Sequence, residues 1–141
     1  MLTESKKLNI AIILLIIFYA TWIFMGILYA STGFMPYHQI KPSIDPDWKI
    51  LIMFLVRYNG ILFIQNGILG LLIIYVGFQK KEKWAWIYFL ISGSFITIPL
   101  LVLFFTYGVM IGVTSPIPNV LIFTVVWIIA MIISYKEFFG E

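Results

Sequence analysis

The sequence predicts an all-α fold: an integral membrane protein built as an antiparallel four-helix bundle with both termini in the cytoplasm. The first reason is composition. Of the 141 residues 62% are hydrophobic and 11% are charged, against about 45–50% and about 25% in soluble domains. The second is the presence of four long apolar runs, at about 8–29, 50–78, 84–107 and 117–135. The third is the position of six of the eight lysines. They flank the ends of the runs that an antiparallel arrangement brings to one side of the membrane.

Each run is long enough to cross a hydrocarbon core about 30 Å thick at about 1.5 Å per residue. Helices are expected, because a spanning backbone in lipid must satisfy its own hydrogen bonds. The first run, 8–29, follows Lys6 and Lys7. It exceeds the roughly 7–15 apolar residues of a signal-peptide core, so we interpret it as a retained anchor. One domain is expected over residues 1–141.

The second run, 50–78, follows a helix-start signal. Asp45 suits an N-cap and Pro46 suits the first helical position. The third run, 84–107, begins after the short connection 79–83, which predicts that the second and third helices are adjacent and antiparallel. Pro99 should kink the third helix and free a backbone carbonyl one turn earlier. The fourth run, 117–135, follows a loop with two prolines.

Lysines also predict orientation, because basic residues concentrate on the cytoplasmic side. Arg57, the only arginine, lies 23 residues before Lys80, or about 34 Å along a helix. It is therefore expected at the outer membrane boundary, where its long side chain can reach water. The apolar segment 50–56 would then extend beyond the membrane core. We predict that the proline-rich first loop, about 31–49, forms a cap over it on the outer side.

Each helix places a polar residue at a similar height above the lysines: Thr21, Asn66, Thr97 and Thr124. One interpretation is a set of hydrogen bonds that hold the bundle together. The alternative is a polar pocket in its outer half. The candidate ligand-binding residues for such a pocket are Arg57, Asn59, Gln65, Asn66, Ser94 and Thr97. Arg57 would meet an anionic headgroup, and the amides would orient polar atoms of the ligand.

Glycines on the second helix predict close packing against a neighbouring helix. At about 100° per residue, Gly70 and Gly77 share a stripe with Asn59 and Asn66, and Gly60 and Gly67 flank it. The segment 92–94 of the third helix, Ser-Gly-Ser, is a candidate partner for this stripe.

Several chemistries are disfavoured by what the sequence lacks. Without cysteine there is no disulfide or thiol chemistry. We expect no acidic residue inside any span, which argues against a proton- or cation-coupled exporter. The single histidine, His38, lies in the first loop, and no metal-binding or nucleotide-binding motif occurs. No cofactor, metal site or nucleic-acid partner is therefore expected, and no residue is assigned as catalytic.

Two segments carry a resemblance to known proteins. They are Arg57-Tyr58-Asn59-Gly60, continued by Gly67 and Gly70, and Lys80-Lys81-Glu82-Lys83-Trp84-Ala85-Trp86. The chain resembles small uncharacterised four-helix integral membrane proteins of prokaryotes and is broadly similar to the DoxX-like group. The turn of that group contains glycine, whereas this chain has Lys81-Glu82-Lys83. The resemblance implies four helices and their topology, and no particular activity.

The expected function is that of a multi-pass protein of the cell membrane without enzymatic activity. It would act as an accessory subunit or as a binding module for a lipid or another apolar ligand. Its partners would be membrane lipid, other membrane subunits or further copies of itself. The alternative is a small oligomeric transporter or channel. A membrane enzyme acting on lipid or quinone is a third class, disfavoured because the spans contain no evident acid or base.

Overall fold

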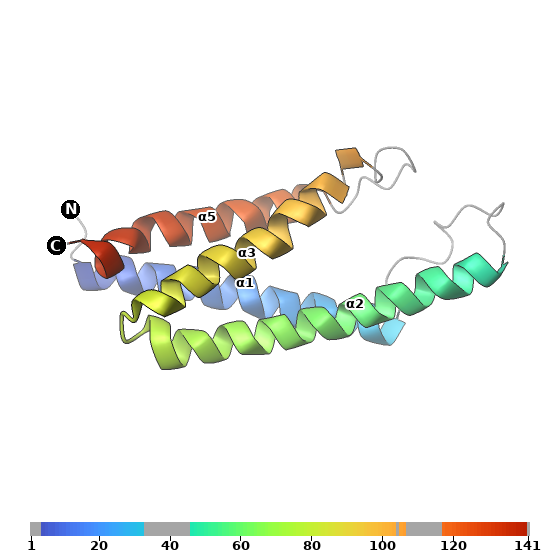
Figure 1. Ribbon diagram of the computed structural model, residues 1–141, viewed down its shortest axis with the longest axis horizontal. Coiled ribbons are helices and arrows are strands. Elements are labelled where there is room, and N and C mark those ends of the chain that lie inside the picture. The colour runs from blue at the N-terminus through green and yellow to red at the C-terminus, as the bar shows by residue number, and fades with distance from the viewer. Residues whose placement is uncertain (1–3, 33–45, 104, 107–116, 141) are drawn as a thin grey trace. The chain divides into compact units, whose positions relative to one another are not determined.

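In the computed structural model, the described residues are 4–32, 46–103, 105–106 and 117–140, and the regular elements among them are all helical (Figure 1). These elements are α1 (Glu4–Thr32), α2 (Pro46–Ile73), the π-helical turn η2 (Ile74–Phe78), α3 (Lys83–Leu103) and α5 (Ile117–Phe139). The four predicted apolar helices are thus confirmed in number and in type.

The observed helix boundaries agree with the predicted ones at some points and differ from them at others. α2 begins at Pro46, as its helix-start signal predicts, and η2 ends at Phe78, where the second apolar run ends. Pro99 lies inside α3 without ending it. α5 continues to Phe139, past the predicted end at Tyr135. The expected cap over α2 depends on residues 33–45, which lie outside the described residues. This range includes His38 and the predicted N-cap residue Asp45.

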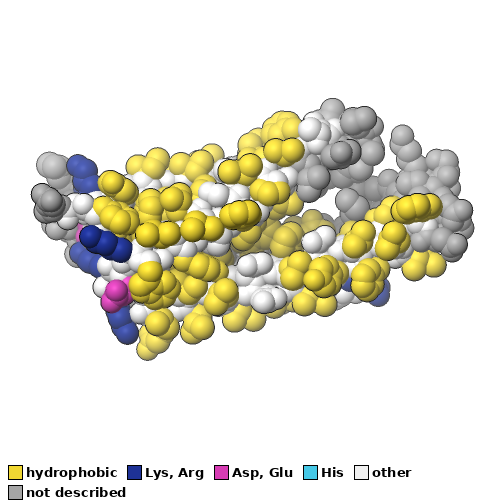
Figure 2. All heavy atoms as spheres, in the orientation of Figure 1, with side chains coloured by type: hydrophobic (Ala, Val, Ile, Leu, Met, Phe, Trp, Pro, Cys, Tyr) yellow, Lys and Arg dark blue, Asp and Glu magenta, His cyan; other side chains and the backbone are white. Residues whose placement is uncertain are grey.

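All four α-helices are long and apolar enough to cross a membrane, with spans at 6–31, 48–78, 83–102 and 120–139. Only 22–33% of the most apolar part of each span is buried within the protein. Large apolar side chains such as Tyr75, Phe95 and Ile132 are exposed instead, and apolar atoms cover most of the described surface in Figure 2. Water-soluble proteins rarely expose apolar surface this extensive, so hydrocarbon is the solvent that suits it.

The chain divides into two compact units. The first unit comprises residues 1–18 and 72–141, and the second unit comprises residues 19–71. Both divisions fall inside helices, because α1 and α2 each contribute to both units. The prediction of a single domain over 1–141 stays a prediction, and each unit is described by itself.

In the second unit, glycines bring α1 and α2 into backbone contact. A Cβ at Gly26 would lie 2.6 Å from the carbonyl oxygen of Gly60, and one at Gly67 would lie 2.9 Å from the carbonyl oxygen of Tyr19. A Cβ at Gly70 would overlap the ring of Tyr19. The contacts move toward the start of α1 as they move along α2, so the helices are antiparallel. The glycines of α2 in this unit therefore pack against α1. Segment 92–94 belongs to the first unit, and its packing against α2 stays a prediction.

The first unit has one buried face on each of its helical segments. On α1 this face recurs every three or four residues, as expected for a helix with one side against a core. The buried residues of these faces are Leu8, Ala11, Leu15 and Phe18 on α1, Ala85, Phe89, Gly93 and Thr97 on α3, and Trp127, Ala130, Met131, Ser134 and Phe138 on α5. Phe78 of η2 joins them, with its ring centroid 5.3 Å from that of Phe89 and 4.7 Å from that of Phe138.

The connection from η2 to α3 is closed by backbone hydrogen bonds. The N–H of Glu82 donates to the carbonyl of Gly77, and the N–H of Lys81 donates to the carbonyl of Phe78, both at 3.1 Å. These two bonds form a Schellman motif, whose left-handed position is usually glycine. Lys81 occupies it here with φ of 59°, at a cost of about 1 kcal/mol.

Six lysines gather at one end of the first unit, which we call the lysine-rich end: Lys6, Lys7, Lys80, Lys81, Lys83 and Lys136. The start of α1, the connection between η2 and α3, and the end of α5 all lie there (Figures 1 and 2). The structure thus brings together the lysines whose grouping was predicted from the sequence.

A substitution at Gly60 tests the close approach of α1 and α2. An added Cβ would lie 2.5 Å from the backbone nitrogen of Ala30 and 2.8 Å from the carbonyl oxygen of Gly26. Because these are backbone atoms, Gly60→Ala must separate the helices, and we expect it to destabilise the fold by about 1–3 kcal/mol.

The measurement is the unfolding of the detergent-solubilised protein. Ile61→Leu is the matched control, because Ile61 is exposed on the same helix and a surface exchange should stay within about 0.5 kcal/mol. Equal stability of Gly60→Ala and the wild type would contradict the backbone contact.

Candidate functional site

The predicted polar layer makes its hydrogen bonds mostly within individual helices. The side chain of Asn66 donates to the carbonyl of Leu62 at 2.9 Å, and that of Thr97 donates to the carbonyl of Gly93 at 2.7 Å. Ser94 and Thr124 also donate to the carbonyl four residues earlier, both at 2.7 Å. Such bonds satisfy a hydroxyl in an apolar setting without joining two helices, so these donors do not provide the predicted interhelical bonds.

The six candidate residues are divided between the two units. Arg57, Asn59 and Gln65 are exposed on α2 in the second unit, where Asn66 is half-buried. Ser94 is half-buried and Thr97 is 1% exposed, both on α3 in the first unit. Each group is placed only within its own unit, so a pocket shared by all six stays a prediction.

Arg57 lines a small hollow on α2 in the second unit. The hollow has a volume of about 340 Å³, and its lining residues are Lys49, Ile50, Met53, Phe54 and Arg57. Lys49, Met53 and Arg57 are spaced by four residues and therefore share one helix face. The face joins two cations to an apolar surface. The position of Arg57 at the membrane boundary stays a prediction.

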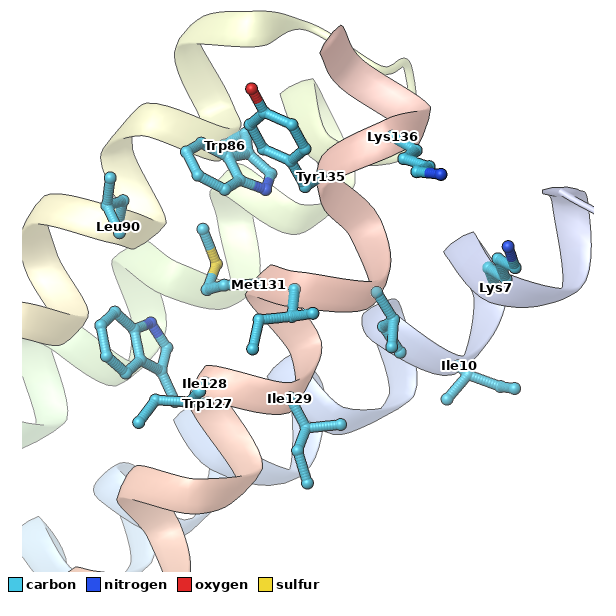
Figure 3. Close-up of a pocket in the computed structure, with 12 residues that line it drawn as sticks. Lys7, Ile10, Trp86, Leu90, Trp127, Ile128, Ile129, Met131, Tyr135 and Lys136 are labelled. Atoms are coloured by element: carbon cyan, nitrogen blue, oxygen red, sulfur yellow. The ribbon is translucent and has the colours of Figure 1, made fainter. Parts of the chain in front are cut away.

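A larger hollow lies in the first unit, along the outward side of α5 and between parts of α1 and α3 (Figure 3). We call it the α5 groove. Its volume is about 860 Å³. The lining residues are Lys7, Ile10, Trp86, Leu90, Trp127, Ile128, Ile129, Met131, Ile132, Ile133, Tyr135 and Lys136. None of the six predicted site residues is among them.

Two tryptophans form much of the groove wall beside α3, and both indole N–H groups are already hydrogen-bonded. Trp127 donates from Nε1 to the carbonyl of Phe89 at 3.0 Å, and Trp86 donates from Nε1 to Oγ of Ser134 at 3.2 Å. Gly93 leaves room for the indole of Trp127, since a Cβ there would overlap the ring. The two indoles therefore present apolar surface to the groove, since their polar atoms are engaged with the protein.

The charged residues in the described lining stand at one end of the groove. Lys7 projects from α1 and Lys136 from α5, both at the lysine-rich end (Figure 3). Neither side chain forms an ion pair within the described part of the chain. Away from these two lysines and the Tyr135 hydroxyl, the lining is aliphatic, thioether or indole surface.

No direct signal in the sequence points to this site. Its walls are isoleucines and tryptophans, which in a membrane span resemble residues that face lipid, and its two lysines served the sequence analysis only as markers of topology. The one available signal is Gly93, a residue without a side chain on α3 that accommodates Trp127 of α5.

A buried acidic residue corrects the expectation that no carboxylate lies inside a span. Glu137 belongs to α5 and to the span 120–139, and its side chain is 3% exposed. Its Oε2 lies 2.8 Å from Nζ of Lys81, whose side chain is 47% exposed. The error arose because the fourth run was ended at Tyr135. The ion pair ties the connection between η2 and α3 to the end of α5.

Comparisons with known proteins add no assignment: no protein family, curated protein or solved structure matches this chain. The resemblance to DoxX-like proteins therefore stays a prediction.

The ion pair between Lys81 and Glu137 should respond unequally to loss of either partner. Lys81→Gln leaves a carboxylate buried without its cation, and we expect a destabilisation of about 1–3 kcal/mol. Glu137→Gln removes the buried charge and leaves Lys81 in contact with water, so its cost should be smaller.

Thermal unfolding of both single variants and of the double variant in one detergent checks this order. The double variant should be no less stable than Lys81→Gln alone, since it has no unpaired carboxylate. If Glu137→Gln were the more destabilising single change, the carboxylate would not depend on Lys81.

Proposed function

We propose that this protein is a multi-pass integral membrane protein, with its lysine-rich end in the cytoplasm, that binds a lipid acyl chain or a similar apolar ligand in the α5 groove. The observation that carries the proposal is the groove itself: about 860 Å³ of apolar hollow on a helix that is apolar enough to cross a membrane. Its volume falls in the range of about 300–1,000 Å³ common for small-molecule sites.

The chemistry of the lining suits an acyl chain. Such a chain offers no hydrogen-bonding group, and the wall asks for none, because Trp86 and Trp127 direct their indole N–H groups to Ser134 and to the backbone of Phe89. Contacts with Leu90 and Ile128 would provide dispersion attraction along the chain.

Binding without chemical conversion is favoured by the same lining. Among the described lining residues there is no carboxylate and no imidazole, and these are the groups that most often act as general acids and bases. Glu137, the buried carboxylate of α5, is engaged with Lys81 rather than exposed in the groove. We therefore favour a lipid-binding module over a membrane enzyme.

Filling the groove tests the proposal. Ile128→Trp adds bulk to a side chain that lines it, so the variant should retain several-fold less lipid through purification in a mild detergent. The measurement is native mass spectrometry, which resolves the protein with and without bound lipid.

The matched control is Ile122→Trp, which makes the same exchange on α5 at an exposed position outside the groove lining. This control should retain lipid as the wild type does. Equal lipid retention by Ile128→Trp and the wild type would overturn the proposed function.

A further inference from the structure

We propose that the α5 groove selects an anionic phospholipid, with the headgroup phosphate held between the ammonium groups of Lys7 and Lys136 and an acyl chain lying along α5. This inference rests on the proposed function, because it names the class of lipid that the same groove binds. It assigns to two lysines a role in recognition, in addition to the role in topology predicted from the sequence.

The position of the two cations favours an anionic ligand. Both line the same groove, one from α1 and one from α5, and both stand at the same end of it (Figure 3). Lys7 is half-buried, whereas Lys136 is exposed. An anion bound between two ammonium groups is attracted to both of them.

Two other lysines of this end have contacts within the protein. Lys81 is paired with Glu137 at 2.8 Å, and Lys83 lies over the ring of Phe139, 5.7 Å from its centroid. Lys7 and Lys136 form no ion pair within the described residues, so their ammonium groups are available to an external anion. Phosphate oxygens accept charge-assisted hydrogen bonds from such groups.

Charged, aromatic and apolar side chains follow one another along the groove. Lys136 lies at its charged end and Ile128 lies eight residues earlier on α5, about 12 Å away along the helix. Trp86 and Tyr135 stand close together, with ring centroids 5.6 Å apart, near the charged end, which suits aromatic rings at a membrane interface. A phospholipid has the same order, with an anionic head, an interfacial ester region and an apolar tail.

A lipid accounts for this combination better than a helix of a partner protein. A helix seated on Ile128 and Ile132 would cover the apolar surface, but it would need an acidic residue placed at both lysines at once. A phosphate joined to an acyl chain supplies the charge and the apolar surface in one molecule. Basic sites between membrane helices are known to bind anionic headgroups in this manner.

The test compares two lipids with identical acyl chains: phosphatidylglycerol, which is anionic, and phosphatidylcholine, which has no net charge. Each is titrated into the full-length detergent-solubilised protein, and bound lipid is measured by native mass spectrometry. We expect the wild type to bind phosphatidylglycerol more tightly. Lys7→Gln combined with Lys136→Gln should weaken that binding about 25-fold, at about fivefold for each lysine near a membrane surface, and should leave phosphatidylcholine binding unchanged.

The matched control combines Lys6→Gln with Lys80→Gln. It removes the same charge from the same end, but neither residue lines the groove. This control should keep most of the preference for phosphatidylglycerol. The preference of the wild type should also shrink as salt is raised, since screening weakens contacts at the exposed Lys136.

The outcomes separate the two proposals. Equal affinity of the wild type for both lipids, or an equal loss in the control, overturns the role of Lys7 and Lys136 and leaves lipid binding in place. If neither lipid binds, or if Ile128→Trp binds both as the wild type does, the groove is not a lipid site and both proposals fail. Selective loss in the Lys7 and Lys136 variant supports both.

Discussion

Apolar side chains do not drive helices together in hydrocarbon, because lipid is as apolar as they are. The helices of this protein must therefore associate through close contact and through polar bonds, and the structure shows examples of both. In the second unit, Gly26 and Gly60 allow the backbones of α1 and α2 to meet. In the first unit, α3 and α5 are joined by hydrogen bonds from Trp127 to the backbone of Phe89 and from Trp86 to Ser134.

The same bonds determine the character of the groove. Because each indole directs its N–H toward the protein, Trp86 and Trp127 present only ring surface to the hollow along α5. Gly93 makes the placement of Trp127 possible. A bond that holds two helices together thus also produces an apolar surface in the hollow, with Lys7 and Lys136 as the charged groups at its end. The ion pair of Lys81 and Glu137 holds the neighbouring connection in place.

Sequence reasoning was sound where a property depends on the run of residues along one helix. The four helices, the start of α2 at Pro46 and the end of η2 at Phe78 follow from apolar length and turn chemistry, and the structure confirms them. It was wrong about acidic residues, since Glu137 lies inside the last span. The burial of Glu137 could not be inferred from the sequence, because it depends on pairing with Lys81, 56 positions away.

The sequence by itself determined the class of the protein, because a chain that is 62% hydrophobic has too little polar surface for water, and its four long apolar runs are long enough for helices that cross a membrane. Only the tertiary structure decided which residues meet. Polar residues in the spans, such as Asn66 and Thr97, donate hydrogen bonds within their own helices, and a site formed by them stays a prediction. The α5 groove instead combines isoleucines, tryptophans and two lysines from three helices. Their convergence depends on how the helices pack, which periodicity along one helix does not contain.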